Sequence, residues 1–420
     1  MPRRQGYALP IALAAGTAVL AAVAAYGTSL VVNDRSQPYG GSETHAAARN
    51  PAAPAAAAGT WVATWTGAPV SAEPNAGRGY PGSTVRNIVH TSVGGDAARI
   101  TLSNLFGTAP LVIDQVGVNT RRVTFGGSPT VTIAAGRQVV SDPVVVPVAP
   151  DSDLEVTLRT PYATGAVTQH PNTHQTSYLA DTRGTWSTTR WRYLTAVDVR
   201  NKTSPGAIVV IGDSLTAGTG STTDADARWT DVLADRLRHT YGIANQGIAG
   251  NRLLIDSPRT MQGVANLGGL SATRRFERDV LSVSGAKTVI IALGINDVQQ
   301  YPQETDPRRI TAGLRALTER AHARGLRVVG ATLTPFQGYP SWSPESNAVR
   351  QAVNAEIRSG RIFDAYVDFD RAVRDPYAPN RVLPEYDSGD HLHFNDAGYQ
   401  ALGHAIDLST VDGTPKSDSF

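Results

Sequence analysis

One serine and one aspartate–histidine pair stand out in the sequence as residues that could carry out acyl transfer. Ser214 follows the apolar run Ala207–Ile211 and a turn containing Gly212, which places its hydroxyl at the end of a predicted buried strand. Asp390 and His393 are three residues apart, so in a helical turn the carboxylate could hold the imidazole. A serine hydroxyl becomes a nucleophile when such a base removes its proton.

Two further segments offer hydrogen-bond donors that could stabilise an oxyanion. The first, Asn245–Gly250, ends in a glycine whose backbone N–H can approach a ligand because no side chain intervenes. In the second, Asn296 follows the predicted strand Thr288–Leu293 and supplies an amide donor.

Each pattern taken alone has a structural alternative. Asp213 or Ser214 could simply cap a helix, and Asp390 with His393 could be a loop ion pair. The two donor segments could be a plain turn and an asparagine-stabilised turn. The elements around these residues therefore decide the interpretation.

The second half of the chain alternates strands with helices, which predicts a parallel sheet covered on both faces. Since ligands bind at the carboxyl ends of the strands in such sheets, Ser214 is expected at this edge. Predicted strands are Ala207–Ile211, Gly242–Asn245, Thr288–Leu293, Arg327–Ala331 and Ala365–Phe369. Helices are expected around residues 229–237, 276–281, 310–321, 349–357 and 399–406.

The first half has the texture of β structure, with short β-branched runs between Gly, Pro, Asn or Asp, and predicts a β-sandwich. The tryptophans are expected in its core, with a sugar-binding face as the alternative. His170 and His174 are expected at the surface, with a contact to the neighbouring domain as the alternative. The runs are Thr84–Val93, Arg99–Asn104, Leu111–Asn119, Thr130–Ile133, Val144–Val148 and Leu154–Leu158.

The amino-terminal segment resembles a secretory signal, because two arginines precede an apolar run from about Tyr7 to Tyr26. An uncleaved membrane anchor is the alternative. The predicted organisation begins with a signal or anchor at residues 1–29 and an Ala/Pro-rich linker at 30–59. A β-sandwich-like domain at 60–200, a catalytic domain at 201–410 and a polar tail at 411–420 follow.

Composition narrows the partners and the chemistry. The net charge of +2 favours neither nucleic acid nor an anionic membrane as partner, and the absence of cysteine excludes disulfides and cysteine catalysis. No stable membrane partner is expected unless the amino-terminal segment stays uncleaved, and the oligomeric state is not predicted. The serine chemistry requires no cofactor and no metal.

Together the four motifs resemble the SGNH hydrolases, the GDSL esterase/lipase family, in that family's order. Gly212-Asp213-Ser214-Leu215 matches the nucleophile block, and the segments ending at Gly250 and Asp297 match the two oxyanion blocks. Asp390-His391-Leu392-His393 matches the family's Asp-x-x-His. The match covers roughly residues 207–408; Phe394 stands where many members have proline.

This resemblance implies a flavodoxin-like three-layer α/β domain and assigns a role to each residue. Ser214 would be the nucleophile, His393 the base and Asp390 its orienting partner, while Ser214, Gly250 and Asn296 would form the oxyanion hole. The β-rich half followed by this domain also resembles a bacterial branch grouped with xylan-degradation esterases. The Gly-x-Ser-x-Gly motif of α/β-hydrolases is absent around Ser214.

The sequence therefore predicts a secreted serine esterase that hydrolyses short acyl or acetyl esters of a polar or carbohydrate alcohol. Its substrate would be a small-molecule or polysaccharide ester. The alternatives are a lipase or phospholipase, an acyltransferase that passes the acyl group to an alcohol, and a carbohydrate-binding protein with a degenerate site.

Overall fold

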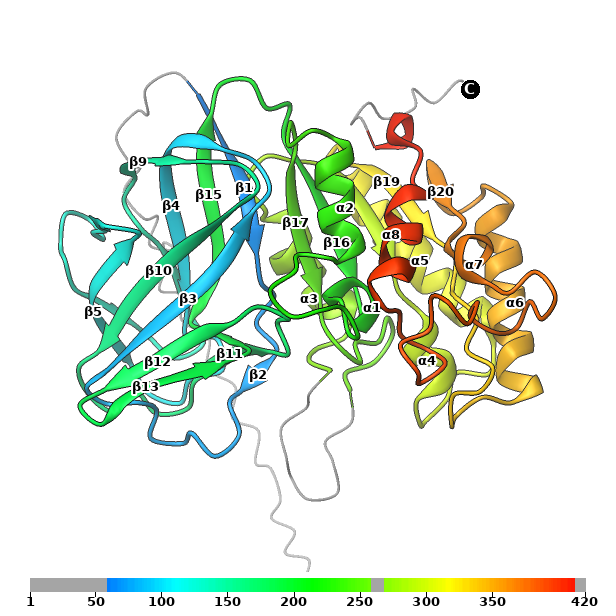
Figure 1. Ribbon diagram of the computed structural model, residues 1–420, viewed down its shortest axis with the longest axis horizontal. Helices are drawn as coiled ribbons and strands as arrows, with labels where there is room; N and C mark the ends of the chain where they lie inside the picture. Colours follow the sequence, from blue (N-terminus) through cyan, green and yellow to red (C-terminus); the bar gives the residue numbers. More distant parts are fainter. Residues whose placement is uncertain (1–58, 258–267, 412–420) are drawn as a thin grey trace, which may run out of the picture. The chain divides into compact units, whose positions relative to one another are not determined.

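The computed structural model describes residues 59–257 and 268–411 (Figure 1). The predicted signal segment, nearly all of the linker and the tail beyond residue 411 lie outside the described residues. In the described part of the chain, no helix is long and apolar enough to span a membrane.

Antiparallel strands make up the first half, as the sequence predicts. One sheet has the order β1-β15-β4-β8, and β9 also pairs with β4. A second sheet has the order β13-β12-β3-β10-β5-β6, and β7 also pairs with β5. A third, small sheet has the order β14-β11-β2. The strands are β1 (Thr60–Thr66), β2 (Ser71–Ala72), β3 (Ser83–Thr91), β4 (Gly95–Ser103), β5 (Leu111–Val118), β6 (Arg121–Arg122), β7 (Val131–Ile133), β8 (Gln138–Val140), β9 (Val144–Val148), β10 (Ser152–Thr160), β11 (Thr168–Pro171), β12 (Ser177–Asp181), β13 (Gly184–Thr188), β14 (Arg190–Arg192) and β15 (Leu194–Asn201).

Side-chain alternation explains how these sheets enclose a core. Along the paired strands β3 and β10, every second residue is buried, among them Val85, Val89, Leu154 and Val156. Successive side chains of a strand point to opposite faces, so one face of the sheet packs inward and the other is left more exposed. The predicted strands with one buried face are confirmed.

The tryptophans of this half divide between core and surface. Trp65 and Trp191 are buried and pack edge to face with ring centroids 4.7 Å apart. The Trp186 side chain, in contrast, is exposed to solvent. The core interpretation is therefore correct for the first pair and wrong for Trp186.

The second half contains a parallel sheet in the order β17-β16-β18-β19-β20. Its strands are β16 (Ala207–Gly212), β17 (Gly242–Gly247), β18 (Ala286–Ala292), β19 (Arg327–Ala331) and β20 (Ala365–Val367). The helices are α1 (Ser214–Ala217), α2 (Trp229–Arg236), α3 (Ala272–Phe276), α4 (Ile295–Gln299), α5 (Pro307–His322), α6 (Pro344–Arg358), α7 (Phe369–Val373) and α8 (Asp396–His404), with a π-helical turn η1 (Glu277–Leu281) and a 3₁₀ turn η2 (Leu408–Thr410).

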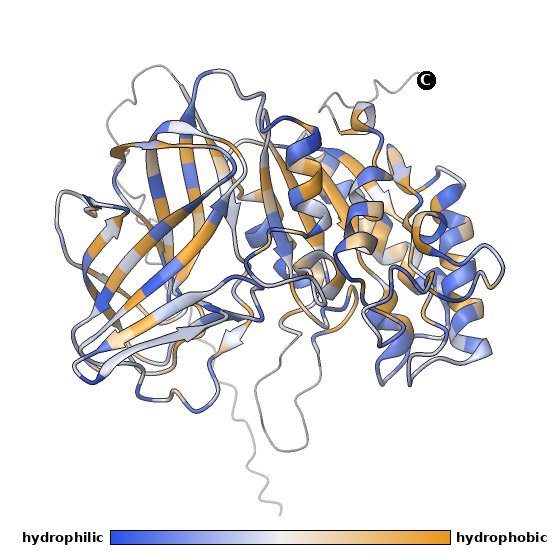
Figure 2. Ribbon diagram, viewed as in Figure 1, coloured by the Kyte–Doolittle hydropathy of each residue, from blue (hydrophilic) through white to orange (hydrophobic). Residues whose placement is uncertain are grey.

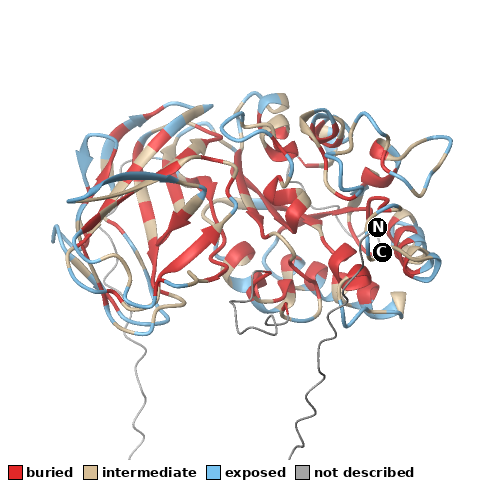
Figure 3. Cartoon of the chain, turned by 60° about the horizontal axis from the view of Figure 1, so that its bottom comes forward, coloured by how far each residue is buried: buried red, intermediate tan, exposed pale blue. Residues whose placement is uncertain are grey.

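Helices cover both faces of this sheet, so its strands are apolar almost throughout (Figure 2). Val209 and Ile211 of β16 pack with residues of α3, α5 and α6, whereas Ile208 and Val210 pack with α2 and α8. Most residues of these strands are buried, as the centre of this half shows in Figure 3, with Tyr366 of β20 as an exposed exception. Unbroken apolar runs are typical of parallel strands that are buried on both faces. The predicted three-layer α/β arrangement is confirmed.

Two local predictions differ from the structure. The helix expected over Phe276–Leu281 is the end of α3 followed by the π-helical turn η1. The segment from Asp390 to His393 is a series of bends and not a helical turn.

Strand β1 links the two halves, because it lies along the edge of the parallel sheet. The Ala63 N–H donates to the Ser284 carbonyl at 3.0 Å, and the Thr66 hydroxyl donates to the Asn245 carbonyl at 3.1 Å. A Cβ on Gly242 of β17 would lie 2.1 Å from the Ala63 carbonyl oxygen, so only glycine permits this approach. The described residues, 59–257 and 268–411, belong to one compact unit.

Candidate active site

The turn after β16 presents Ser214 as the first residue of α1. The Asp213 carboxylate caps the helix by accepting from the Leu215 N–H at 3.0 Å. The backbone N–H of a first helical residue is not used by the helix and stays available as a donor. A Cβ on Gly212 would lie 2.0 Å from the Thr216 hydroxyl, so the turn requires glycine there. The helix cap and the position of the Ser214 hydroxyl are therefore two consequences of one turn.

Ser214, His393 and Asp390 form a hydrogen-bonded line. The Ser214 Oγ lies 2.9 Å from the His393 Nε2, and the His393 Nδ1 lies 2.6 Å from the Asp390 Oδ2. Ser214 is 6% exposed, and the side chains of His393 and Asp390 are 14% and 44% exposed. The site therefore opens to solvent on the aspartate side while the serine is enclosed.

The Asp390 carboxylate is held in its charged form. Burial alone would raise its pKa, but hydrogen bonds from the His393 ring and from the backbone N–H groups of His393 and Leu392 lower the pKa below its ordinary value. A carboxylate that stays ionised can fix the imidazole with its Nδ1–H toward Asp390 and its Nε2 lone pair toward Ser214.

Asn296, in the first turn of α4, has its amide orientation set by two neighbours. Its Oδ1 accepts from the side-chain amides of Gln299 at 2.9 Å and Gln300 at 2.8 Å. Its Nδ2 donates to the Asn251 carbonyl at 2.9 Å, which leaves the second Nδ2 hydrogen for another acceptor.

Gly250 follows β17 with a φ of +74°, a backbone conformation that favours glycine. Its carbonyl accepts from the Gln300 side chain at 3.2 Å. Because Gln300 also bonds Asn296, the structure brings the two sequence-predicted donors into one hydrogen-bonded cluster.

Arg275 ties the strand ends of this site together, a role that its sequence context does not indicate. Its guanidinium is 1% exposed and donates to the carbonyls of Gly212 and Gln246 at 3.0 and 2.8 Å. It also donates to the Asn251 side chain at 3.0 Å and pairs with Asp279 at 3.0 Å. Arg275 thereby fixes the end of β16, the end of β17 and the loop after Gly250 relative to one another.

Asp297, next to Asn296, holds the same loop from the other side. Its buried carboxylate accepts from the backbone N–H groups of Leu253 at 2.7 Å and Leu254 at 3.0 Å. Burial raises the pKa of Asp297 in spite of these two bonds. The last residue of the Gly-Ile-Asn-Asp motif is thus a support for the loop that carries Gly250.

The surface expectation is wrong for His170, which is 6% exposed and whose Nδ1 donates to the Ala68 carbonyl at 2.6 Å. His174 is half-buried, and its Nε2 is covered. Its backbone carbonyl accepts from the Asp224 N–H, in the second half of the chain, at 3.0 Å. The alternative, a contact with the neighbouring domain, is therefore correct for His174.

The loop between α1 and α2, residues 219–228, connects this contact to the catalytic segment. The Thr222 N–H donates to the Asp396 carboxylate at 2.8 Å, and the Tyr399 hydroxyl donates to the Thr219 carbonyl at 2.7 Å. Asp224 in turn accepts from Thr176 of the β-rich half. In the described part of the chain, the side-chain groups with metal-ligand spacing are His90 with Asp153 and Asp226, and Asp151 with Asp235 and His239. Neither group includes Ser214, His393 or Asp390.

Residues 210–401 match the model of the GDSL-like lipase/acylhydrolase family. This part of the chain belongs to that family. The GDSL domain makes the chain a serine hydrolase that acts on ester bonds. No curated protein matches the chain.

Solved structures of GDSL and related hydrolases are similar to the GDSL domain at low identity. An aryl esterase of M. smegmatis is 21% identical and covers 49% of this chain and 99% of its own, with a TM-score of 0.38. A lipolytic protein of the G-D-S-L family from Desulfitobacterium hafniense is 21% identical, with coverages of 47% and 96% and a TM-score of 0.36. A carbohydrate acetylesterase from Sinorhizobium meliloti is 20% identical, with coverages of 48% and 95% and a TM-score of 0.36.

Proposed function

We propose that the chain hydrolyses short acyl esters of polar or carbohydrate alcohols through an acyl-enzyme on Ser214. The observation that carries the proposal is the hydrogen-bonded line from Ser214 through His393 to Asp390. The Ser214 Oγ attacks the ester carbonyl carbon while the His393 Nε2 takes its proton, and Asp390 stabilises the imidazolium that forms.

The tetrahedral oxyanion is bound by the backbone N–H groups of Ser214 and Gly250 and by the Nδ2 of Asn296. His393 then returns the proton to the leaving alcohol as the bond between that oxygen and the acyl carbon breaks. A water molecule repeats the sequence on the acyl-enzyme, with His393 again as base, and releases the acid and free Ser214.

The preference for short acyl groups follows from the loops around the site. Thr219–Arg228 and Gln337–Glu345 are polar and rich in Gly, Ser and Pro, and the Asp390 side chain is open to solvent. A long acyl chain gains about 0.8 kcal/mol for each methylene that it buries, so a site with little apolar surface gives it little advantage. The polar loops around the site suit an ester whose alcohol is itself polar.

We also propose that the chain is exported. The arrangement of Arg3, Arg4 and the apolar run after Tyr7 supports this, with retention by an uncleaved anchor as the alternative. Amino-terminal sequencing of chain collected from the culture medium tests it, because a mature terminus near residue 24 is expected and an intact Met1 would contradict cleavage.

A series of aryl esters from acetate to laurate tests the substrate proposal. We expect kcat/KM to be highest for acetate or another short acyl group, and a steady rise to laurate would favour a lipase. Product analysis with an added alcohol separates hydrolysis from acyl transfer. The Ser214→Ala variant serves as the control, since it must lose activity toward every ester in the series.

A further inference from the structure

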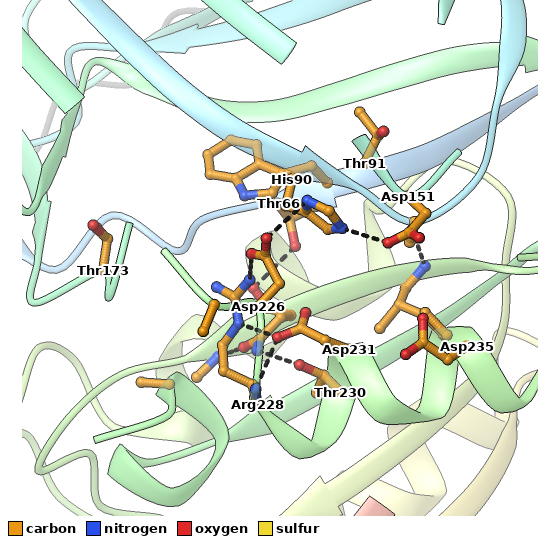
Figure 4. Close-up of a pocket in the computed structure, with 18 of the residues that line it drawn as sticks. Thr66, His90, Thr91, Asp151, Thr173, Asp226, Arg228, Thr230, Asp231 and Asp235 are labelled. Carbon is orange, nitrogen blue, oxygen red and sulfur yellow. Dashed lines mark hydrogen bonds and ion pairs between the residues drawn. The ribbon is translucent and has the colours of Figure 1, made fainter. Parts of the chain in front are cut away.

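A cavity of about 240 Å³ lies where the β-rich half meets the GDSL domain (Figure 4). His90 and Asp151 line it from the β-rich half, and Asp226, Asp235 and His239 line it from the GDSL domain. The lining also includes the buried rings of Trp65, Trp191 and His170. No residue of the Ser214–His393–Asp390 line takes part in lining it.

Negative charge at this junction exceeds the positive charge that faces it. Arg228 pairs with Asp231 at 2.6 Å and with Asp226 at 3.3 Å. Beyond these, the carboxylates of Asp151, Asp153 and Asp235 lie against the two imidazoles. Five carboxylates thus lie around one guanidinium and two imidazoles, and such an excess of carboxylates attracts a cation.

The imidazole of His90 has a carboxylate on each edge. Its Nε2 lies 3.0 Å from the Asp151 Oδ1, whereas its Nδ1 lies 3.1 Å from the Asp226 Oδ2 and 3.4 Å from the Asp153 Oδ1. When the Nε2–H donates to Asp151, the Nδ1 of the neutral ring is a bare lone pair that faces two carboxylate oxygens. The Asp153 Oδ1 already accepts from the Gln175 side-chain amide at 2.8 Å, so the Nδ1 and the Asp226 Oδ2 are the two acceptors that need a cation or a proton between them.

His239 repeats this arrangement on the GDSL side. Its Nδ1 donates to the Ser92 carbonyl at 3.2 Å, which leaves the Nε2 of the neutral ring as an acceptor. That Nε2 lies 3.4 Å from the Asp235 Oδ1 and 4.0 Å from the Asp151 Oδ2. A backbone carbonyl that fixes the tautomer and turns the other nitrogen toward carboxylates is typical of histidines that bind metals.

A third imidazole, that of His170, is 6% exposed and also lines the cavity. Its Nδ1 donates to the Ala68 carbonyl at 2.6 Å. Burial lowers the pKa of His170 to about 4, so this ring brings no positive charge to the cavity.

We propose that this junction binds divalent transition-metal ions of the Zn²⁺ type through two adjoining donor sets. One set is His90, Asp153 and Asp226, and the other is Asp151, Asp235 and His239. The ligand atoms within each set lie within 4.8 Å of one another, and each set draws on both halves of the chain. Imidazole nitrogen combined with carboxylate oxygen suits Zn²⁺, whereas Ca²⁺ takes oxygen ligands alone.

The bound ions stabilise the contact between the two halves and take no part in the ester chemistry. Asp226 belongs to the loop of residues 219–228, which also bonds the segment that follows His393 through Asp396. An ion at Asp226 therefore holds in place the same loop that bonds the segment after His393.

Metal titration of the full chain tests the proposal. After dialysis against a chelator, ZnCl₂ should raise the Tm by a few degrees at saturation, because an ion that binds only the folded state stabilises it. The bound metal after gel filtration is counted by elemental analysis, and two Zn²⁺ per chain are expected. MnCl₂ and CaCl₂ are titrated in parallel.

Variants assign the two sets separately. His90→Gln and His239→Gln should each remove one Zn²⁺, and Asp153→Asn, at an exposed position, should weaken the first set without affecting folding. His322→Gln is the matched control, because it removes an imidazole that pairs with Asp364 at 3.0 Å elsewhere in the GDSL domain. Equal Zn²⁺ binding by all four variants, no binding by the parent chain, or a response to CaCl₂ alone would overturn the proposal.

Discussion

Two histidine–aspartate pairs lie next to each other in the segment before α8, and only one of them is placed for catalysis. In both pairs the imidazole Nδ1 is 2.6 Å from a carboxylate oxygen, His393 with Asp390 and His391 with Asp387. Both carboxylates also accept two backbone N–H groups. The bonding within the pairs is therefore nearly the same.

The pairs differ in what the other edge of the imidazole meets. The His393 Nε2 faces Ser214 and the ring is 14% exposed, whereas the His391 ring is 54% exposed. An aspartate–histidine pair in a loop is therefore not by itself a sign of catalysis. The pair of Asp390 and His393 is a candidate triad because the turn after β16 brings the Ser214 hydroxyl to the His393 Nε2. The following predictions test this difference, beginning with the largest effect.

Removing the nucleophile or its base should nearly abolish turnover. We expect Ser214→Ala and His393→Ala each to lower kcat by roughly a thousandfold or more, because the members of a triad act as a unit. His391→Ala is the matched control and should be mild. Steady-state kinetics on an aryl acetate measure both, and an inactive His391→Ala beside an active His393→Ala would reverse the assignment.

Arg275, whose buried guanidinium supports the strand end before Ser214, should matter more than the half-buried Arg278. Arg275→Met removes the buried partner of Asp279 and the donors to Gly212, Gln246 and Asn251, so it should lower the free energy of unfolding by about 3–5 kcal/mol. It should also reduce kcat by displacing the strand ends.

Arg278→Met provides the comparison for that change. Arg278 also bonds Asp279 but touches none of the three groups at the strand ends. Urea unfolding and kinetics of the two variants should show the larger loss for Arg275→Met, and an equal loss of kcat in both would show that Arg275 acts only through the ion pair.

Replacing Asn296 by alanine should lower kcat by about a hundredfold with little change in KM. The lost donor binds the oxyanion more strongly in the transition state than it binds the ester carbonyl. Gln300→Ala keeps the donor and removes one of the two groups that orient it, so its effect should be smaller. A loss confined to KM would contradict the oxyanion role.

Local patterns in the sequence predict the fold well because they report which faces are buried. Alternation in Leu154–Leu158 and the unbroken apolar run Ala207–Ile211 give the sandwich strand β10 and the central strand β16. Three of the four motifs follow the strands β16, β17 and β18, whose carboxyl ends lie at the same edge of the parallel sheet. The fourth, Asp390–His393, lies in the loop before α8.

Contacts between distant segments could not be predicted in this way. Arg275 is one arginine among many in the sequence, and its importance depends on carbonyls at the ends of two strands. The burial of His170 and the facing positions of His90 and His239 depend on how the two halves pack. Local periodicity contains no information on that packing.

The last prediction concerns Asp213, the carboxylate directly before Ser214. Burial raises its pKa from 3.8 to about 7, against the hydrogen bond from the Leu215 N–H that lowers it. The folded state then binds a proton that the unfolded state releases between about pH 4 and pH 7, so this group makes stability fall as pH rises through that window.

Asp213→Asn keeps an oxygen that can accept from the Leu215 N–H and removes the titration. The parent chain should therefore lose about 1 kcal/mol of unfolding free energy relative to the variant between pH 6 and pH 7. Urea unfolding at several pH values measures this difference. Asp390 behaves in the opposite way, because folding lowers its pKa. The Asp390 carboxylate therefore stabilises the fold at pH values above its ordinary pKa, and this contribution is lost as the pH falls through the lowered pKa. The Asp390→Asn variant should lack this loss. Parallel pH curves for the parent and Asp213→Asn would show that Asp213 is ionised in the folded chain across this range.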